Sequence, residues 1–168
     1  MNDAQCWIER LGLQRHPEGG YYRESYRSGE SVAVTALSDR YAGSRNYATA
    51  IYYLLEGDYF SAFHRLLTDE IWHYYGGCGA KLHLLNPAGT YTLLRLGANL
   101  SESEHPQVTV PAGTWFAAEP SARQAFILAG CTLSPGFDFA DFEMGDRDVL
   151  CGQFPDHSDL IGRLTRSS

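Results

Sequence analysis

The chain lacks any long apolar run and any excess of basic residues. Its longest purely apolar stretches, such as residues 50–55 and 125–129, fall far short of the roughly 20 residues that cross a bilayer. Acidic residues outnumber Lys and Arg by 20 to 13, for a formal charge of −7, whereas a phosphate backbone requires clustered cations. We therefore expect neither a membrane nor a nucleic acid as a partner.

Targeting signals, cysteine pairs and interdomain linkers are also missing. The first ten residues contain charges and no apolar signal-peptide core, so we expect a cytoplasmic protein. The four cysteines lie too far apart for the C-x-x-C pair of a zinc or redox site and are expected to be reduced thiols. Because no repeat or low-complexity tract divides the chain, we predict a single domain over residues 1–168.

The chain does contain a succession of short predicted strands separated by turn residues. Their spacing, with Gly, Pro, Asn or Asp at the breaks, is typical of an all-β sandwich or barrel. Short helices are predicted near the two ends, over residues 4–11 and 156–165. The predicted strands cover residues 21–27, 47–55, 61–67, 70–75, 80–85, 91–96, 108–110, 114–119, 125–133 and 137–142.

The strand predicted over residues 21–27 has two mixed, aromatic-rich faces. Alternation places Tyr22, Glu24 and Tyr26 on one face, and Arg23 and Arg27 on the other. Such a strand is expected at a subunit interface or a pocket rim. Arg23 is a candidate for binding a carboxylate or phosphate of a ligand, and an edge ion pair at a dimer interface is the alternative.

Several motifs resemble those of the cupins. The stretch Gly57-x6-His64-x5-Glu70-x6-Gly77, followed by Pro111-Ala-Gly113, resembles the two-part cupin signature. More narrowly, HPEGGYYRESYRS (16–28), SAFHRLLTDEIWHYYGG (61–77) and VPAGTWFAAE (110–119) resemble a family of small single-domain cupins of unassigned function. The resemblance implies a cupin-type double-stranded β-helix, or jelly-roll barrel, with a small-molecule pocket, and it implies a homodimer.

The metal ligands of the cupin signature are only half present. In that family the signature supplies three His and one Glu to a divalent metal. Here His64 and Glu70 match, but Leu66 and Phe116 stand at the other two positions, and strand alternation turns His73 away. Since a first-row metal usually needs three or more protein ligands, we expect no cofactor, and a divalent metal at His64 and Glu70 is the alternative.

His64 is the central candidate for chemistry. An unperturbed histidine pKa of about 6.5 suits proton transfer near neutral pH, and Glu70 would orient the ring. The alternative is a buried structural pair. For the aromatic candidates, which would line the pocket, plain core packing is the alternative. The predicted catalytic group is His64, Glu70, Tyr53 and Tyr74, and the predicted ligand-binding group is Arg23, Trp72 and Phe116.

Two further segments are interpreted as structural. Residues 16–20, HPEGG, are best explained as a turn with glycines at positive φ, and catalysis by His16 is the alternative. Residues 136–143 alternate aromatic with polar side chains, as a half-buried strand does, so their three phenylalanines are expected in the core.

These residues support two main functional hypotheses. The first is a metal-independent isomerase or epimerase acting on a carbohydrate or nucleotide-sugar-like molecule, by analogy with sugar epimerases that share the cupin barrel. In it, His64 with Glu70 would remove a proton, and Tyr53 or Tyr74 would supply one. The second is a non-catalytic protein that binds a small ligand. A metal-dependent cupin enzyme is a third hypothesis, which requires His73 or a second subunit to complete the site.

Overall fold

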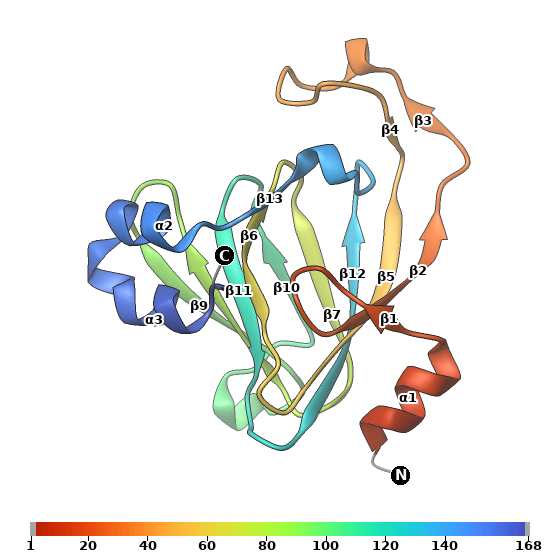
Figure 1. Ribbon diagram of the computed structural model, residues 1–168. Helices are drawn as coiled ribbons and strands as arrows, with labels where there is room; N and C mark the ends of the chain where they lie inside the picture. Colours follow the sequence, from red (N-terminus) through yellow and green to blue (C-terminus); the bar gives the residue numbers. More distant parts are fainter. Residues whose placement is uncertain (1–2, 167–168) are drawn as a thin grey trace.

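Two antiparallel sheets packed face to face form the body of the protein in a computed structural model that describes residues 3–166 (Figure 1). The first and last two residues of the expected 1–168 domain lie outside this range. One sheet contains, in spatial order, β1 (Gln14–Arg15), β2 (Tyr21–Arg27), β5 (Thr49–Glu56), β12 (Phe126–Leu133), β7 (Glu70–Gly77) and β10 (Gln107–Val110). The other contains β13 (Phe142–Met144), β6 (Ser61–Leu66), β11 (Trp115–Pro120), β8 (Ala80–Leu85) and β9 (Tyr91–Leu96). The predicted jelly-roll barrel is confirmed.

The core lies between the two sheets, because each strand turns alternate side chains inward. Tyr53 of β5, Trp72 of β7 and Phe116 of β11 are each 1% exposed and meet edge to face. Strand β12 pairs with both β5 and β7, so the most extensive ladders of the molecule run through it. Leucine, isoleucine and alanine side chains fill the remaining interior.

Short helices cover the outer faces of both sheets, on opposite sides of the barrel in Figure 1. Helix α1 (Asp3–Leu11) packs Ile8 against Leu54 and Leu128 of the first sheet. Helices α2 (Arg147–Gln153) and α3 (Ser158–Arg163) cover Phe63 and Trp115 of the second. Helix α3 falls within the predicted segment 156–165, whereas α2 was not predicted. No helix within residues 3–166 is long and apolar enough to span a membrane.

The segment after β12 differs from the strand predicted over residues 137–142. A 3₁₀ turn occupies Phe139–Asp141, and β13 begins only at Phe142. Side-chain acceptors explain the difference, because the Asp138 carboxylate accepts from the nearby backbone N–H of Ala140, and Thr49 Oγ1, distant in the chain, accepts from that of Phe137. The alternating pattern is therefore that of a loop rather than a strand, and Phe139 is 58% exposed instead of lying in the core.

A β-bulge in β2 changes which side chains share a face. Glu24 pairs with Ile51 and Tyr26 with the neighbouring Ala50, so Ser25 is an extra residue in the ladder. Beyond the bulge the alternation reverses. Arg27 consequently shares the inner face with Glu24, and Tyr26, which was predicted on that face, is 56% exposed.

The chain between β2 and β5 leaves the barrel and stands away from it at the top of Figure 1. It contains β3 (Ser31–Val32), a 3₁₀ turn (Val34–Ala36) and β4 (Arg45–Asn46). Arg45 ties this excursion to the barrel through two hydrogen bonds to Asp141, of 2.7 Å from Nε and 2.6 Å from an Nη, and both side chains are 5% exposed. The pair thus joins the excursion to the loop that precedes β13.

Removal of the Asp141 carboxylate should be strongly destabilising, because it leaves the Arg45 guanidinium buried without its counter-charge. We expect Asp141→Ala to lower the free energy of unfolding in urea by about 3–5 kcal/mol. The matched control is Glu143→Ala, since Glu143 makes an exposed pair with Arg65, and its cost should be about 1 kcal/mol or less. Equal costs for the two variants would contradict the structural role of the buried pair.

Candidate functional site

A cavity of about 530 Å³ opens between the two sheets, within the range of about 300–1,000 Å³ typical of ligand pockets. Its wall is formed by β2, β5, β6, β7 and β12, by the turn between β1 and β2, and by the loop before β13. The lining residues are His16, Glu18, Tyr22, Glu24, Arg27, Thr49, Ile51, His64, Leu66, Glu70, Cys131, Leu133, Phe137, Asp138, Phe139 and Phe142.

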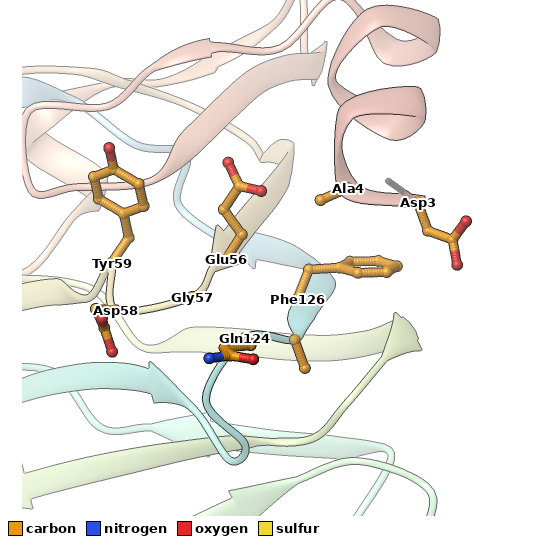
Figure 2. Close-up of a pocket in the computed structure, with 9 residues that line it drawn as sticks. Asp3, Ala4, Glu56, Gly57, Asp58, Tyr59, Gln124 and Phe126 are labelled. Atoms are coloured by element: carbon orange, nitrogen blue, oxygen red, sulfur yellow. The ribbon is translucent and has the colours of Figure 1, made fainter. Parts of the chain in front are cut away.

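A second depression, of about 700 Å³, lies between α1 and the turn that follows β5 (Figure 2). None of its described lining residues is a histidine, a cysteine or a basic residue. Figure 2 shows the labelled side chains, among them Asp3, Glu56, Asp58 and Tyr59, spread around the gap rather than converging on one point. The chemistry-bearing groups are in the barrel cavity, which we take as the candidate site.

Glu18 and His64 form a buried pair in the cavity wall. His64 Nε2 lies 3.1 Å from Glu18 Oε2, and the two side chains are 2% and 8% exposed. His64 Nδ1 lies 2.7 Å from the Ala62 carbonyl, which only accepts, so this nitrogen carries a proton. The pair therefore shares one proton between Nε2 and Oε2. Ser61 Oγ donates to the other Glu18 oxygen at 2.9 Å and fixes the carboxyl group in place.

The turn between β1 and β2 places Glu18 and His16 at the cavity. Gly19 and Gly20 follow at φ values of 123° and 71°, and a Cβ on Gly20 would lie 2.6 Å from the Leu54 carbonyl oxygen, so the turn requires glycine. His16 Nδ1 accepts the backbone N–H of Glu18 at 3.2 Å. Burial lowers the pKa of His16 and so favours a neutral ring. The charge of Glu18 opposes this effect but does not outweigh it.

Glu70, at the start of β7, is a buried carboxyl group on the same cavity. Burial raises its pKa to about 8, with a further contribution from the charge of Glu18. Trp72 Nε1 donates to its Oε2 at 2.9 Å, and the Cys131 thiol also interacts with it, and both contacts oppose the rise. Near neutral pH the Glu70 carboxyl is consequently protonated and able to donate.

The predicted aromatic residues form the layer beneath the cavity rather than its wall. Tyr53, Trp72 and Phe116 pack in the core, and the Phe116 ring centroid lies 4.1 Å from that of His64. The Tyr53 hydroxyl donates to the Gly19 carbonyl at 2.7 Å, and burial raises its pKa well above the usual value. Tyr53 therefore holds the turn that presents Glu18, and its proton is engaged by the Gly19 carbonyl.

Tyr74 and Arg23 lie away from the cavity that contains His64. The Tyr74 hydroxyl donates to the Gly77 carbonyl, beside a separate depression next to β8 and β9. Arg23 lies over the Tyr52 ring on the other face of β2. The basic residue that lines the cavity is Arg27, which the bulge brings to this face.

The metal-binding pattern of the cupin signature does not fit these residues. Leu66 and Phe116 are apolar at two of the four positions, and both ring nitrogens of His64 already have partners. His73 lies 3.1 Å from Thr132 Oγ1 and does not line the cavity. Within the described part of the chain, no three His, Cys, Asp or Glu side chains come together as a metal site.

Sequence reasoning missed Glu18 and Arg27 as cavity residues. The HPEGG segment was interpreted as a turn, with catalysis by His16 as the alternative and no role for Glu18, and the structure places both side chains on the cavity. Two titratable residues next to glycines that require positive φ were the available signal. Arg27 carried no such signal, because a one-residue bulge determines its face.

Comparison with known proteins agrees with this architecture. A family model described as Cupin superfamily (DUF985) matches residues 5–145. Protein SO0799 from Shewanella oneidensis is 35% identical with a TM-score of 0.89, covering 100% of each chain. A hypothetical protein from Leishmania major is 32% identical with a TM-score of 0.87, covering 99% of this chain and 100% of that one. The uncharacterized protein YML079W of Saccharomyces cerevisiae is 31% identical over 149 residues, which is 83% of this chain and 74% of the yeast protein.

The raised pKa of Glu70 makes stability depend on pH. The folded protein binds this proton up to about pH 8, whereas the unfolded chain releases it near pH 4.5, so the free energy of unfolding should fall as the pH rises between these values. We expect wild type to lose about 2.5–3 kcal/mol relative to Glu70→Gln between pH 6 and pH 9, measured by urea unfolding. A constant difference between the two proteins over this range would show that Glu70 titrates normally.

Proposed function

Because this chain belongs to the cupin superfamily (DUF985), we propose that it is a small-molecule cupin that transfers protons on a bound ligand without a metal, as an isomerase or epimerase does. The observation that carries the proposal is that two acidic groups on one cavity have different surroundings, because Glu18 lies against His64 and Ser61 whereas Glu70 is buried without a cation. Glu70 is a protonated carboxyl with a pKa of about 8, and the Glu18–His64 pair holds a carboxylate that accepts hydrogen bonds. Such a difference is what acid–base catalysis requires.

The proposed step takes a proton from a carbon next to a carbonyl group of the ligand. The C–H bond breaks and the proton passes to the Glu18 carboxylate, while the electron pair forms a C=C bond. The carbonyl oxygen receives the Glu70 proton and becomes a hydroxyl. For epimerisation, a solvent proton adds to the opposite face of the same carbon, Glu70 takes back the enol hydroxyl proton to restore the carbonyl group, and Glu18 releases its proton to solvent. For isomerisation of a substrate with a hydroxyl on the carbon that lost its proton, Glu18 returns the proton to the former carbonyl carbon and Glu70 takes the proton of that second hydroxyl, where the new carbonyl group forms.

The surrounding residues keep the two acidic groups distinct. His64 Nε2 and Ser61 Oγ hold Glu18 by both oxygens, so its charge is compensated inside the barrel. Glu70 has Trp72 Nε1 and the Cys131 thiol as neighbours, and burial keeps it neutral. Tyr53, one layer below, acts as a positioning residue through the Gly19 carbonyl.

A ligand-binding role without turnover is the second candidate. It is favoured by the engagement of both His64 ring nitrogens, with Ala62 and with Glu18, since a fully engaged ring serves a structural pair as well as a catalytic one. The two functions share the cavity and differ only in whether protons exchange on the ligand.

Solvent exchange separates these candidates. Aldoses, ketoses and sugar lactones that raise the melting temperature would be incubated with the protein in D2O and followed by proton NMR. We expect deuterium at the carbon next to the carbonyl with wild type, and a loss of about 100-fold or more in Glu70→Gln and Glu18→Gln. Glu143→Gln, which removes an exposed carboxylate outside the cavity, is the control and should match wild type. Binding without exchange would leave only the ligand-binding role.

Assembly as a homodimer stays a prediction. Its sequence basis was the family resemblance and the mixed faces of residues 21–27, one face of which contributes Tyr22 and Glu24 to the cavity. Light scattering that returns twice the 18.7 kDa chain mass would support it, and a mass equal to one chain would contradict it.

A further inference from the structure

The charges and aromatic rings of the cavity restrict what the proposed function acts on. Given that function, we infer that the ligand carries no negative charge and presents a flat apolar face to Phe137, Phe139 and Phe142. This restricts the substrate to uncharged or cationic molecules. It removes nucleotide sugars from the substrates considered above, and it excludes sugar phosphates for the same reason.

The three phenylalanines form an aromatic cluster at the cavity. The ring centroids of Phe137 and Phe139 are 4.9 Å apart at an interplanar angle of 81°, and Phe142 lies 6.3 and 6.1 Å from them. Phe142 also stacks on the His64 ring, with centroids 5.4 Å apart. Phe139 is 58% exposed although it lines the cavity, so its side chain offers apolar surface that residues 3–166 leave open.

Arg27 is the only Lys or Arg among the described residues that line the cavity, and most of its N–H donors already have acceptors in the protein. Its Nε and one terminal nitrogen donate to the two carboxylate oxygens of Glu24, at 2.9 and 2.7 Å. The other terminal nitrogen donates to Asn46 Oδ1 at 2.8 Å and to the Phe137 carbonyl at 3.0 Å. Four of its five N–H groups thus have protein acceptors, so a ligand anion could bind the guanidinium through two N–H groups only by displacing an acceptor such as Glu24.

The remaining groups offer an anion no compensation. The Glu18–His64 pair shares a proton and is neutral as a unit, and Glu24 cancels the charge of Arg27. Asp138 adds a carboxylate at the mouth, beside the aromatic cluster. A phosphate or carboxylate entering the cavity would therefore meet like charge and lose its hydration without gaining a cation.

The remaining surface suits a molecule with hydroxyl groups on one edge and a flat apolar face on the other. The apolar face contacts the aromatic cluster, and the hydroxyl edge meets Glu18, Glu70 and His16. A cation is also accommodated, because aromatic faces and carboxylates both attract it.

Three probes of one shape and different charge test this inference: benzyl alcohol, benzylamine and benzoate, titrated at pH 7 against the isotope-labelled protein by NMR. Wild type should bind the alcohol and the amine at least about tenfold more tightly than benzoate. Phe139→Ala, at a position that is 58% exposed, should weaken the binding of benzyl alcohol by about threefold or more. Failure of all three probes to bind, or benzoate binding as tightly as the alcohol, would overturn the inference.

A second variant tests the role of Arg27. Glu24→Gln removes the negative charge that pairs with the Arg27 guanidinium. Benzoate should therefore bind this variant about tenfold more tightly than it binds wild type. Glu143→Gln frees Arg65 of a comparable exposed pair outside the cavity and should leave benzoate binding unchanged. An equal gain in both variants, or none in Glu24→Gln, would overturn the assignment of Arg27.

The binding test with the three probes does not depend on whether the protein is a catalyst. Glu70→Gln should keep the order of the three probes, because Glu70 is neutral at this pH in the folded protein. Charge selection without any deuterium exchange would leave the ligand class standing and refute proton transfer. Deuterium exchange on a ligand together with tight benzoate binding would support proton transfer and refute the inferred ligand class.

Discussion

The Glu18–His64 pair is the interaction on which the site depends. It brings a turn from one sheet against a strand of the other, with the carboxylate held by His64 Nε2 at 3.1 Å and by Ser61 Oγ at 2.9 Å. Burying a carboxylate inside an apolar barrel is costly unless its charge is compensated, and this pair provides the compensation. Two other features place Glu18 in this position. The glycines that follow it allow the backbone conformation of the turn, and the Tyr53 hydroxyl fixes the turn through the Gly19 carbonyl.

The second carboxyl group follows from this arrangement. Glu70 lies on the same cavity but lacks a cation, and both burial and the nearby charge of Glu18 favour its neutral form. One cavity thereby holds a proton donor and a proton acceptor near neutral pH. Compensation of charge also explains the proposed ligand class. Glu24 pairs with the Arg27 guanidinium, so no unpaired cation lines the described wall for a ligand anion. Reactivity and selectivity thus have a common electrostatic origin.

The fold was largely predictable from the sequence, and the site was predictable in part. Turn residues between short strands predicted the sandwich, and β8 and β9 begin and end at the predicted residues. His64 and Glu70 were found because they match the cupin signature. Arg27 and the loop at 137–142 were not found, because a one-residue bulge and hydrogen bonds accepted by Asp138 and Thr49 override the alternating pattern. The bulge and the Thr49 contact depend on partners distant in the chain, which the alternation within one segment does not reveal.

The most direct test of this account is the ionisation of Glu70 itself. Carbon NMR of protein labelled at the glutamate carboxyl group would follow its titration, with the resonance assigned by its absence in Glu70→Gln. The account predicts a pKa of about 8 for this carboxyl, displaced upward from 4.5. Titration near 4.5 would contradict it, because the cavity would then contain two carboxylates at neutral pH and no proton donor at Glu70.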